Sequence, residues 1–358
     1  MEHYIFLLFC ISFFLLFLHR SSAAHRLPPG PFNFPIVGSL HRLGSYPNQS
    51  LFELAKTYGP LMTLRLGDVT AVIASSAEMA KQVLLTHEEA FSDRTVPDAV
   101  ASQPNHESTL AWGVGVGMWR NRRRLCNTQL FTVQRLNLLQ DLRHQKVQQL
   151  IKHIDKQRVS GSQVNIGEVT FATALNLISS TIFSTDIVDP EYSTAQEFKE
   201  LVGRIMGMEL RASDSKARSG DFLDLLLDQC EENESYFTRQ NIKPLILDLF
   251  IAGSDTSALT TEWAMAELLR KPQVLQKTKR ELMEVIGSGR AVQESDINEF
   301  PYLEAVVKET MRLYPGAPLL LPYKAKKDVE ICGYTIPKNA QVLVNAWAIG
   351  RDPTTVET

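Results

Sequence analysis

An almost unbroken apolar run close to the N-terminus, residues 4–18, constrains this chain more than any other feature. Inside lipid the backbone has no water to bind, so such a run can satisfy its polar groups only as a helix. The run is shorter than the roughly 20 residues that cross a bilayer core, so flanking residues would have to extend it. Basic residues follow the run, which favours an uncleaved anchor with the body on the cytoplasmic side: His19, Arg20, His25 and Arg26.

The alternative interpretation of this run is a cleaved secretory signal, with the small residues 21–24 as the cleavage site. No basic segment precedes the run, and this counts against cleavage. We therefore predict a membrane anchor over residues 1–24. Prolines crowd residues 25–38, where they exclude helix interior and sheet centre and predict a stiff hinge. Residues 39–358 would form the folded body.

Composition excludes several classes of protein. With 358 residues, 44% of them hydrophobic and 22% charged, the chain can bury a sizeable core. Its net charge of −3 does not call for a nucleic-acid partner. The four cysteines are scattered without metal-ligand spacing, which indicates reduced thiols of a cytosol-facing protein.

Apolar periodicity predicts a mainly α-helical body with a minor β-sheet. We expect a β-hairpin in which residues 61–66 and 69–74 are the two strands and Gly67-Asp68 forms the turn. Short strands are expected at 329–331 and 341–345. The expected helices are 76–85, 118–130, 133–153, 167–183, 242–271, 272–286 and 302–314.

The segment Ala252-Gly253-Ser254-Asp255-Thr256-Ser257 interrupts the long apolar helix predicted at 242–271. Glycine costs a helix about 1 kcal/mol relative to alanine, and a hydroxyl that bonds the carbonyl one turn back can bend it. One interpretation is a local opening beside Gly253, with Asp255 and Thr256 as a proton path into a dry pocket. The other is a packing glycine beside satisfied hydroxyls and an exposed aspartate.

Two further groups combine charged or polar side chains on one helix face. Glu309 and Arg312 lie three residues apart, as either a partly buried pair or an exposed ion pair. Trp119 and Arg123 lie four apart, and both side chains only donate hydrogen bonds, which suits an anionic ligand such as a pair of carboxylates. The alternative for the second group is a basic, solvated face.

Taken in order, the proline-rich segment 27–40, FSDRT, WRNRRR, AGSDTS, KETMRLYP and GYTIPKNAQVLVNAWAIGRDP resemble a plant-type microsomal cytochrome P450. The resemblance runs from about Leu27 to Pro353 and is strongest to the geraniol 8-hydroxylase-like group. It implies the cytochrome P450 fold behind an anchor in the endoplasmic reticulum membrane. It also implies heme b as cofactor, a small hydrophobic, terpenoid-like substrate, and electrons from NADPH through a partner reductase.

The same resemblance assigns roles to individual residues. Trp119 and Arg123 match the pair that binds the haem propionates. Ala252, Gly253, Asp255 and Thr256 match the oxygen-activation segment of the central helix, where Thr256 would hold a water and Asp255 would help to feed protons. Glu309 and Arg312 match a structural ion pair. A further set matches the segment that lines the substrate pocket: Ala317, Pro318, Leu319 and Leu320.

Three departures from the family pattern lead to further expectations. None of the four cysteines lies in the Gly- and Arg-containing loop that carries the axial thiolate, so no metal ligand is assigned and the chain is expected to be C-terminally truncated and inactive. In the family, a pair of helices covers the substrate channel at about residues 207–213. This chain lacks room for that pair between Gly207 and Ser213, which suggests an internal deletion. Tyr323 stands where relatives usually carry an arginine.

Two alternatives to a working monooxygenase remain open at this point. The chain could be a non-catalytic, membrane-anchored remnant of the family. It could also be an anchored helical interaction module without a cofactor, although this would leave the joint occurrence of the three groups of residues unexplained.

Overall fold

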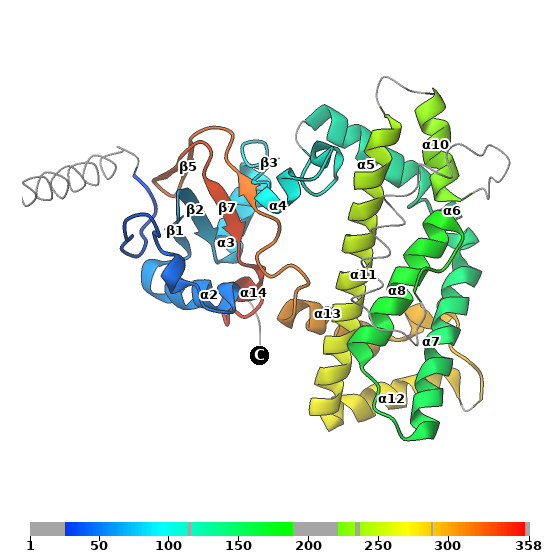
Figure 1. Cartoon of the computed structure of the whole chain (residues 1–358). Coiled ribbons are helices and arrows are strands. Elements are labelled where there is room, and N and C mark those ends of the chain that lie inside the picture. Colours follow the sequence, from blue (N-terminus) through cyan, green and yellow to red (C-terminus); the bar gives the residue numbers. More distant parts are fainter. Residues whose placement is uncertain (1–25, 114–115, 189–220, 233–236, 288, 355–358) are drawn as a thin grey trace, which may run out of the picture. The chain divides into compact units, whose positions relative to one another are not determined.

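The computed structural model describes residues 26–113, 116–188, 221–232, 237–287 and 289–354 (Figure 1). The predicted anchor, Cys10 and the expected deletion near residues 207–213 lie outside these ranges. The chain divides into two compact units. Unit 1 comprises Met1–Thr95 and Ala317–Thr358, and unit 2 comprises Val96–Gly316.

Unit 1 contains both β-sheets, whose strands come from the two ends of the chain. Its strands are β1 (Leu61–Leu66), β2 (Val69–Ala74), β3 (Asp93–Arg94), β4 (Tyr323–Lys324), β5 (Val329–Ile331), β6 (Tyr334–Ile336) and β7 (Gln341–Val344). Its α-helices are α2 (Pro47–Tyr58), α3 (Ala77–Lys81) and α14 (Ala346–Ile349). The larger sheet has the order β1-β2-β7-β4-β3, and β5 pairs with β6 in a second sheet.

The predicted hairpin is confirmed, because β1 and β2 pair antiparallel with Leu66 opposite Val69. β2 then pairs parallel with β7, which fixes the C-terminal part of the chain to the N-terminal part. Successive side chains of these strands point to opposite faces of the sheet and belong to two apolar clusters. Met62, Leu64 and Ile73 belong to one of them, and Val72, Val342 and Val344 to the other.

The residues predicted as a hinge make backbone hydrogen bonds to this unit. The Pro29 carbonyl accepts from the Thr63 amide at 2.8 Å, and the Arg26 carbonyl accepts from the Thr335 amide at 2.9 Å. Gly30 approaches β1 so closely that an added Cβ would lie 1.8 Å from the Thr63 carbonyl oxygen. Glycine is therefore required at this position.

Unit 2 is helical. Its described α-helices are α4 (Asp98–Ala101), α5 (Val116–Gln129), α6 (Val133–Leu138), α7 (Gln140–Ser160), α8 (Ile166–Phe183), α10 (Phe222–Glu232), α11 (Arg239–Arg270), α12 (Pro272–Ile286) and α13 (Pro301–Leu313). Helix α11 packs along α8, as Figure 1 shows. Their apolar side chains form the core of the unit together with α10: Leu175, Ile182, Phe222, Leu226, Leu245, Ile246 and Phe250.

Two predicted helices differ clearly from the structure. The segment predicted as one helix at 133–153 is divided at Leu139, because Thr132 caps the short α6 and α7 begins anew at Gln140. Helix α11 begins at Arg239, so Pro244 lies inside the helix and not in its first turn. The Thr238 backbone N–H donates to the Asn241 side chain at 2.8 Å, and this capping interaction fixes the earlier start.

One helix within the described ranges, α8, is long and apolar enough to cross a membrane, with a mean hydropathy of 1.3. Its buried face includes Leu175 and Ile182, which lie in the core of unit 2. Hydropathy in this helix is therefore explained by packing against α11 and α7.

Candidate active site

Helix α11 carries the predicted oxygen-activation segment without a break in its helical hydrogen bonding. Its hydroxyls bond carbonyls one turn back, so they are satisfied within the helix. Thr256 donates to the Ala252 carbonyl at 2.5 Å, and Ser254 donates to the Phe250 carbonyl. The expected opening is therefore not present in the backbone of this helix.

Gly253 lies where α11 approaches α8. A Cβ added at Gly253 would lie 2.6 Å from Cδ1 of Ile178, a side chain of α8. The space on the Cβ side of Gly253 is thus filled by the Ile178 side chain. This contact explains the glycine by close approach of two helices, the second of the two interpretations drawn from the sequence.

Ala252, Asp255 and Thr256 are exposed on unit 2. Asp255 makes no hydrogen bond or ion pair with the part of the chain that the structure describes. The Thr256 side chain lies beside Gly316, where an added Cβ would meet Cγ2 of Thr256 at 3.4 Å. Both side chains are therefore accessible to water on the same helix.

Trp119 and Arg123 both lie on the exposed face of α5. The Trp119 indole N–H donates to the Leu110 carbonyl at 3.1 Å, so its one donor is already engaged. Arg123 has no hydrogen-bond partner or ion pair among the described residues. Of the two predicted donors to an anionic ligand, Arg123 is free and Trp119 would have to exchange its acceptor.

Glu309 and Arg312 form a two-point ion pair on α13. Arg312 Nε and Nη2 lie 2.6 and 2.5 Å from the Glu309 carboxylate oxygens. This hydrogen bonding lowers the pKa of Glu309 and raises that of Arg312. The side chains remain 51% and 30% exposed, respectively, so the pair is accessible to water rather than enclosed.

The predicted pocket segment lies in unit 1 and forms a turn, in which the Leu320 amide donates to the Ala317 carbonyl at 3.0 Å. The Pro318 carbonyl accepts from the Trp347 amide at 3.1 Å. Leu319 and Leu320 pack against the two different apolar clusters of the unit, while Ala317 is exposed. Next to this turn, the Arg94 guanidinium stacks 4.2 Å from the centre of the Tyr323 ring.

Sequence reasoning missed a polar cluster at the junction of α5 and α11. Arg122 is only 3% exposed, unlike the other arginines of its run. Asp248 accepts hydrogen bonds from the Leu110 and Ala111 amides. Burial raises the pKa of Asp248 to about 6, and burial lowers the pKa of Arg122. The only signal in the sequence was an aspartate within the apolar stretch LILDLF.

The described cysteines do not suit a haem iron that requires a thiolate. Cys126 and Cys230 are buried in the apolar core of unit 2, and burial raises the pKa of each thiol to about 11. Cys332 is exposed in the turn between β5 and β6. A thiolate ligand needs the opposite environment, one that lowers the thiol pKa. Within the described ranges, the residues present therefore do not fit the axial position.

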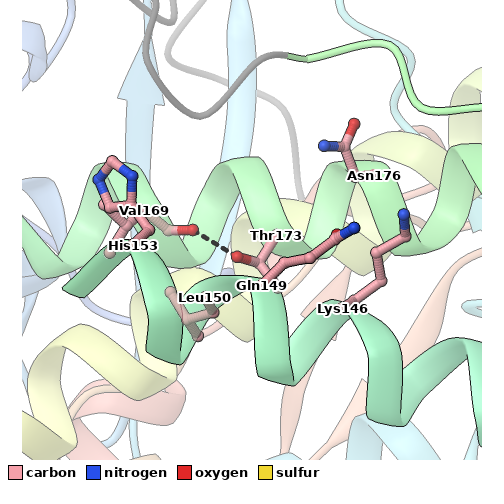
Figure 2. Close-up of a pocket in the computed structure, with 7 residues that line it drawn as sticks. All are labelled: Lys146, Gln149, Leu150, His153, Val169, Thr173 and Asn176. Carbon is pink, nitrogen blue, oxygen red and sulfur yellow. Dashed lines mark hydrogen bonds between the residues drawn. The ribbon is translucent and has the colours of Figure 1, made fainter. Parts of the chain in front are cut away.

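A hollow between α7 and α8 is too small to serve as a substrate site. Its volume is about 20 Å³, room for about one water molecule. Figure 2 shows its lining of Lys146, Gln149, Leu150, His153, Val169, Thr173 and Asn176. Two of its polar groups are already engaged: Lys146 lies 2.5 Å from Asp186, and Thr173 donates to the Val169 carbonyl at 2.7 Å.

Comparison with known proteins decides the family. The family described as Cytochrome P450 matches residues 28–212 and 192–355. The chain belongs to the cytochrome P450 family. Geraniol 8-hydroxylase of Catharanthus roseus is 40% identical over 97% of this chain and 79% of its own length. 7-Ethoxycoumarin O-deethylase of Helianthus tuberosus is 41% identical over 96% of this chain and 78% of its own length.

Solved structures of cytochromes P450 share the fold. A zebrafish cytochrome P450, whose structure was determined with abiraterone, aligns with a TM-score of 0.74 and 27% identity. The alignment covers 87% of this chain and 80% of the zebrafish chain. The prediction of a mainly helical cytochrome P450 fold with a minor sheet is thus confirmed, and the enzyme class of the family is monooxygenase.

Proposed function

We propose that this cytochrome P450 is, by descent, a haem-dependent monooxygenase that inserts one oxygen atom of O₂ into a small hydrophobic, terpenoid-like compound. The relatives named geraniol 8-hydroxylase, at 40% and 38% identity, support this substrate class. In such an enzyme the haem carries the oxygen chemistry and the protein supplies binding, orientation and proton control.

Different residues of this chain would carry out these tasks. Asp255 and Thr256 would hold and pass a proton on the exposed face of α11. Trp119 and Arg123 would bind carboxylates of heme b. Ala317, Pro318, Leu319 and Leu320 would line the substrate site, and the Trp347 amide fixes their turn by donating to the Pro318 carbonyl.

We further propose that these 358 residues by themselves do not turn over substrate. The observation that carries this is the environment of the described cysteines: two thiols have pKa values raised to about 11 and the third lies in a hairpin turn. Neither buried thiol offers a stabilised thiolate to an iron. No catalytic step is therefore assigned through the cofactor.

The membrane setting and the electron source belong to the same proposal. Residues 1–24 would anchor the protein in the endoplasmic reticulum membrane, with the body in the cytoplasm. Electrons would come from NADPH through a partner cytochrome reductase. The apolar run at 4–18 and the basic residues after it support this orientation.

A carbon-monoxide difference spectrum tests the proposal. The full chain is expressed with a haem precursor, reduced and exposed to carbon monoxide, beside geraniol 8-hydroxylase of Catharanthus roseus as the positive control. The expected result is a thiolate-type Soret band in the control and none in this chain, and no oxidation of geraniol with reductase and NADPH. A thiolate band from this chain would contradict the proposed inactivity, and the C126A, C230A and C332A variants would then identify the ligand.

A further inference from the structure

In the segment that precedes α5, Leu110 is held on its two sides by side chains of two helices, α11 and α5. On one side, the Asp248 carboxylate of α11 accepts from the Leu110 amide and, at 3.3 Å, from the Ala111 amide. On the other side, the Leu110 carbonyl accepts from the Trp119 indole at 3.1 Å. The position of Leu110 is therefore determined by an acid on one helix and an indole on another.

Further hydrogen bonds hold the neighbouring residues of this segment. Arg122 donates to the Glu107 carbonyl at 2.8 Å and to the Ser108 hydroxyl at 3.3 Å. Asn241, on α11, donates to the same hydroxyl at 2.6 Å. These contacts place the segment but do not touch Leu110. Within the described residues, Asp248 is the side chain that binds the Leu110 amide.

The contacts around Asp248 compensate part of the cost of ionising this buried carboxyl group. Burial raises its pKa to about 6, while the two amides and the Arg122 guanidinium stabilise the ionised form. Other ionisable groups near Asp248 are Glu107 beside Arg122 and Cys126 on α5. Well above pH 6 the carboxylate is ionised and accepts both hydrogen bonds, which are stronger for a charged acceptor.

We propose that Asp248 is a positioning residue that controls whether the Trp119 indole N–H is available to an anionic ligand. Asp248 fixes the Leu110 amide and thereby places the Leu110 carbonyl where Trp119 binds it. An indole has one N–H, so Trp119 can bind a ligand carboxylate only when it releases this carbonyl. The part of the proposal that concerns a carboxylate of a porphyrin rests on the proposed function, whereas the control of Trp119 by Asp248 does not.

The positioning role is tested in the ligand-free full chain in detergent at a pH well above 6. Selective ¹⁵N-labelling of tryptophan gives indole signals, and the Trp119 signal is assigned with W119F. In D248L, the Trp119 indole proton is expected to exchange about tenfold faster, because Leu110 loses a charge-assisted hydrogen bond that holds it. D248N keeps one acceptor oxygen and is expected to show an intermediate rate, which also serves if D248L does not fold.

Glu281→Gln is the matched control. The Glu281 carboxylate also accepts from two backbone amides, those of Tyr302 and Leu303 at 2.7 and 2.8 Å, but at the start of α13. E281Q is expected to leave the Trp119 exchange rate unchanged. An unchanged rate in both D248L and D248N overturns the positioning role, and so does an equal acceleration in E281Q, which would indicate general destabilisation.

The ligand part is tested with protoporphyrin IX, which contains no iron and needs no thiolate. In the wild type it is expected to shift the Trp119 signal, and its dimethyl ester is not. D248L is expected to bind protoporphyrin IX several-fold more tightly, because Trp119 is already released. Equal or weaker binding by D248L overturns the link to the ligand. Faster indole exchange in D248L, with no porphyrin binding by any variant, supports the positioning role and counts against the proposed function instead.

Discussion

Among the single residues of unit 2, Asp248 shows how burial acts on a charged group. Its carboxylate is withdrawn from water beside the apolar face of α11, and two amides and Arg122 compensate only part of that desolvation. The opposite balance holds at Glu309, where hydrogen bonding by Arg312 outweighs desolvation because the pair remains accessible to water. These two acids therefore have opposite effects on the pH dependence of folding.

The Asp248→Asn variant is expected to change how stability depends on pH. The folded pKa, about 6, lies above the ordinary value of 3.8, so the folded state binds more protons between these values. The Asp248 contribution to stability thus falls as pH rises from 3.8 to about 6 and is constant above. The wild type should lose about 2–3 kcal/mol relative to D248N over this interval, measured by urea unfolding. A difference between the two proteins that does not vary with pH would contradict this.

Removal of the Arg312 guanidinium is expected to cost little stability. R312M should lower the free energy of unfolding by no more than about 1 kcal/mol, because the pair is open to solvent. Lys308→Met on the same helix is the matched control, since Lys308 pairs with Glu304 at 2.6 Å on a more exposed surface. Urea unfolding of both variants provides the measurement. A loss above about 2 kcal/mol in R312M alone would show that the pair acts as a buried one.

Among the elements, α11 joins the core of unit 2 to the exposed candidate site. Its inner face carries Leu245, Ile246 and Phe250, and its hydroxyls are engaged with carbonyls of the previous turn. Gly253 lies against Ile178 of α8. The helix can therefore present Asp255 and Thr256 to solvent without leaving buried polar groups unsatisfied.

Substitutions at Gly253 distinguish packing from an open site. In G253A the new methyl group meets the end of the flexible Ile178 side chain, and the gain in helix propensity, about 1 kcal/mol, offsets its displacement. In G253V the bulk reaches further, and overpacking should cost about 1–3 kcal/mol. The double variant G253V/I178A should recover part of this loss. Equal stability of G253A and G253V in urea unfolding would contradict a close contact between α8 and α11.

The sequence predicted elements where an apolar period persists over many residues, and it missed features formed by distant ones. Helix α12 and the β1–β2 hairpin were predicted at their observed residues, because turn residues and apolar spacing agree there. The strands β3 and β4 have only two residues each, too few for a period. The bond between Asp248 and Leu110 joins residues 138 positions apart, so no local pattern could predict it.

At the scale of the whole molecule, the described chain has separate apolar cores in its two units. Leu64 belongs to a cluster formed around β1, β2 and β7, and Leu245 belongs to the helical cluster of unit 2. No residue is shared between these clusters among the described residues. Strands β2 and β7 nevertheless pair in one sheet. Unit 1 is therefore formed by residues that precede and residues that follow unit 2 in the sequence.

This arrangement predicts that a cavity in the apolar core of one unit destabilises that unit and leaves the other unit unchanged. Leu64 and Leu245 are both fully buried, and L64A and L245A should each cost about 2–5 kcal/mol. Hydrogen exchange followed by mass spectrometry should show faster exchange in β1, β2 and β7 for L64A, and in α8, α10 and α11 for L245A. Leu138→Ala, at a position 70% exposed, is the control and should change neither. If L64A accelerated exchange in α8 and α11 as much as in its own sheet, the units would unfold as one cooperative body, because only a shared transition transmits a local cavity to a distant core.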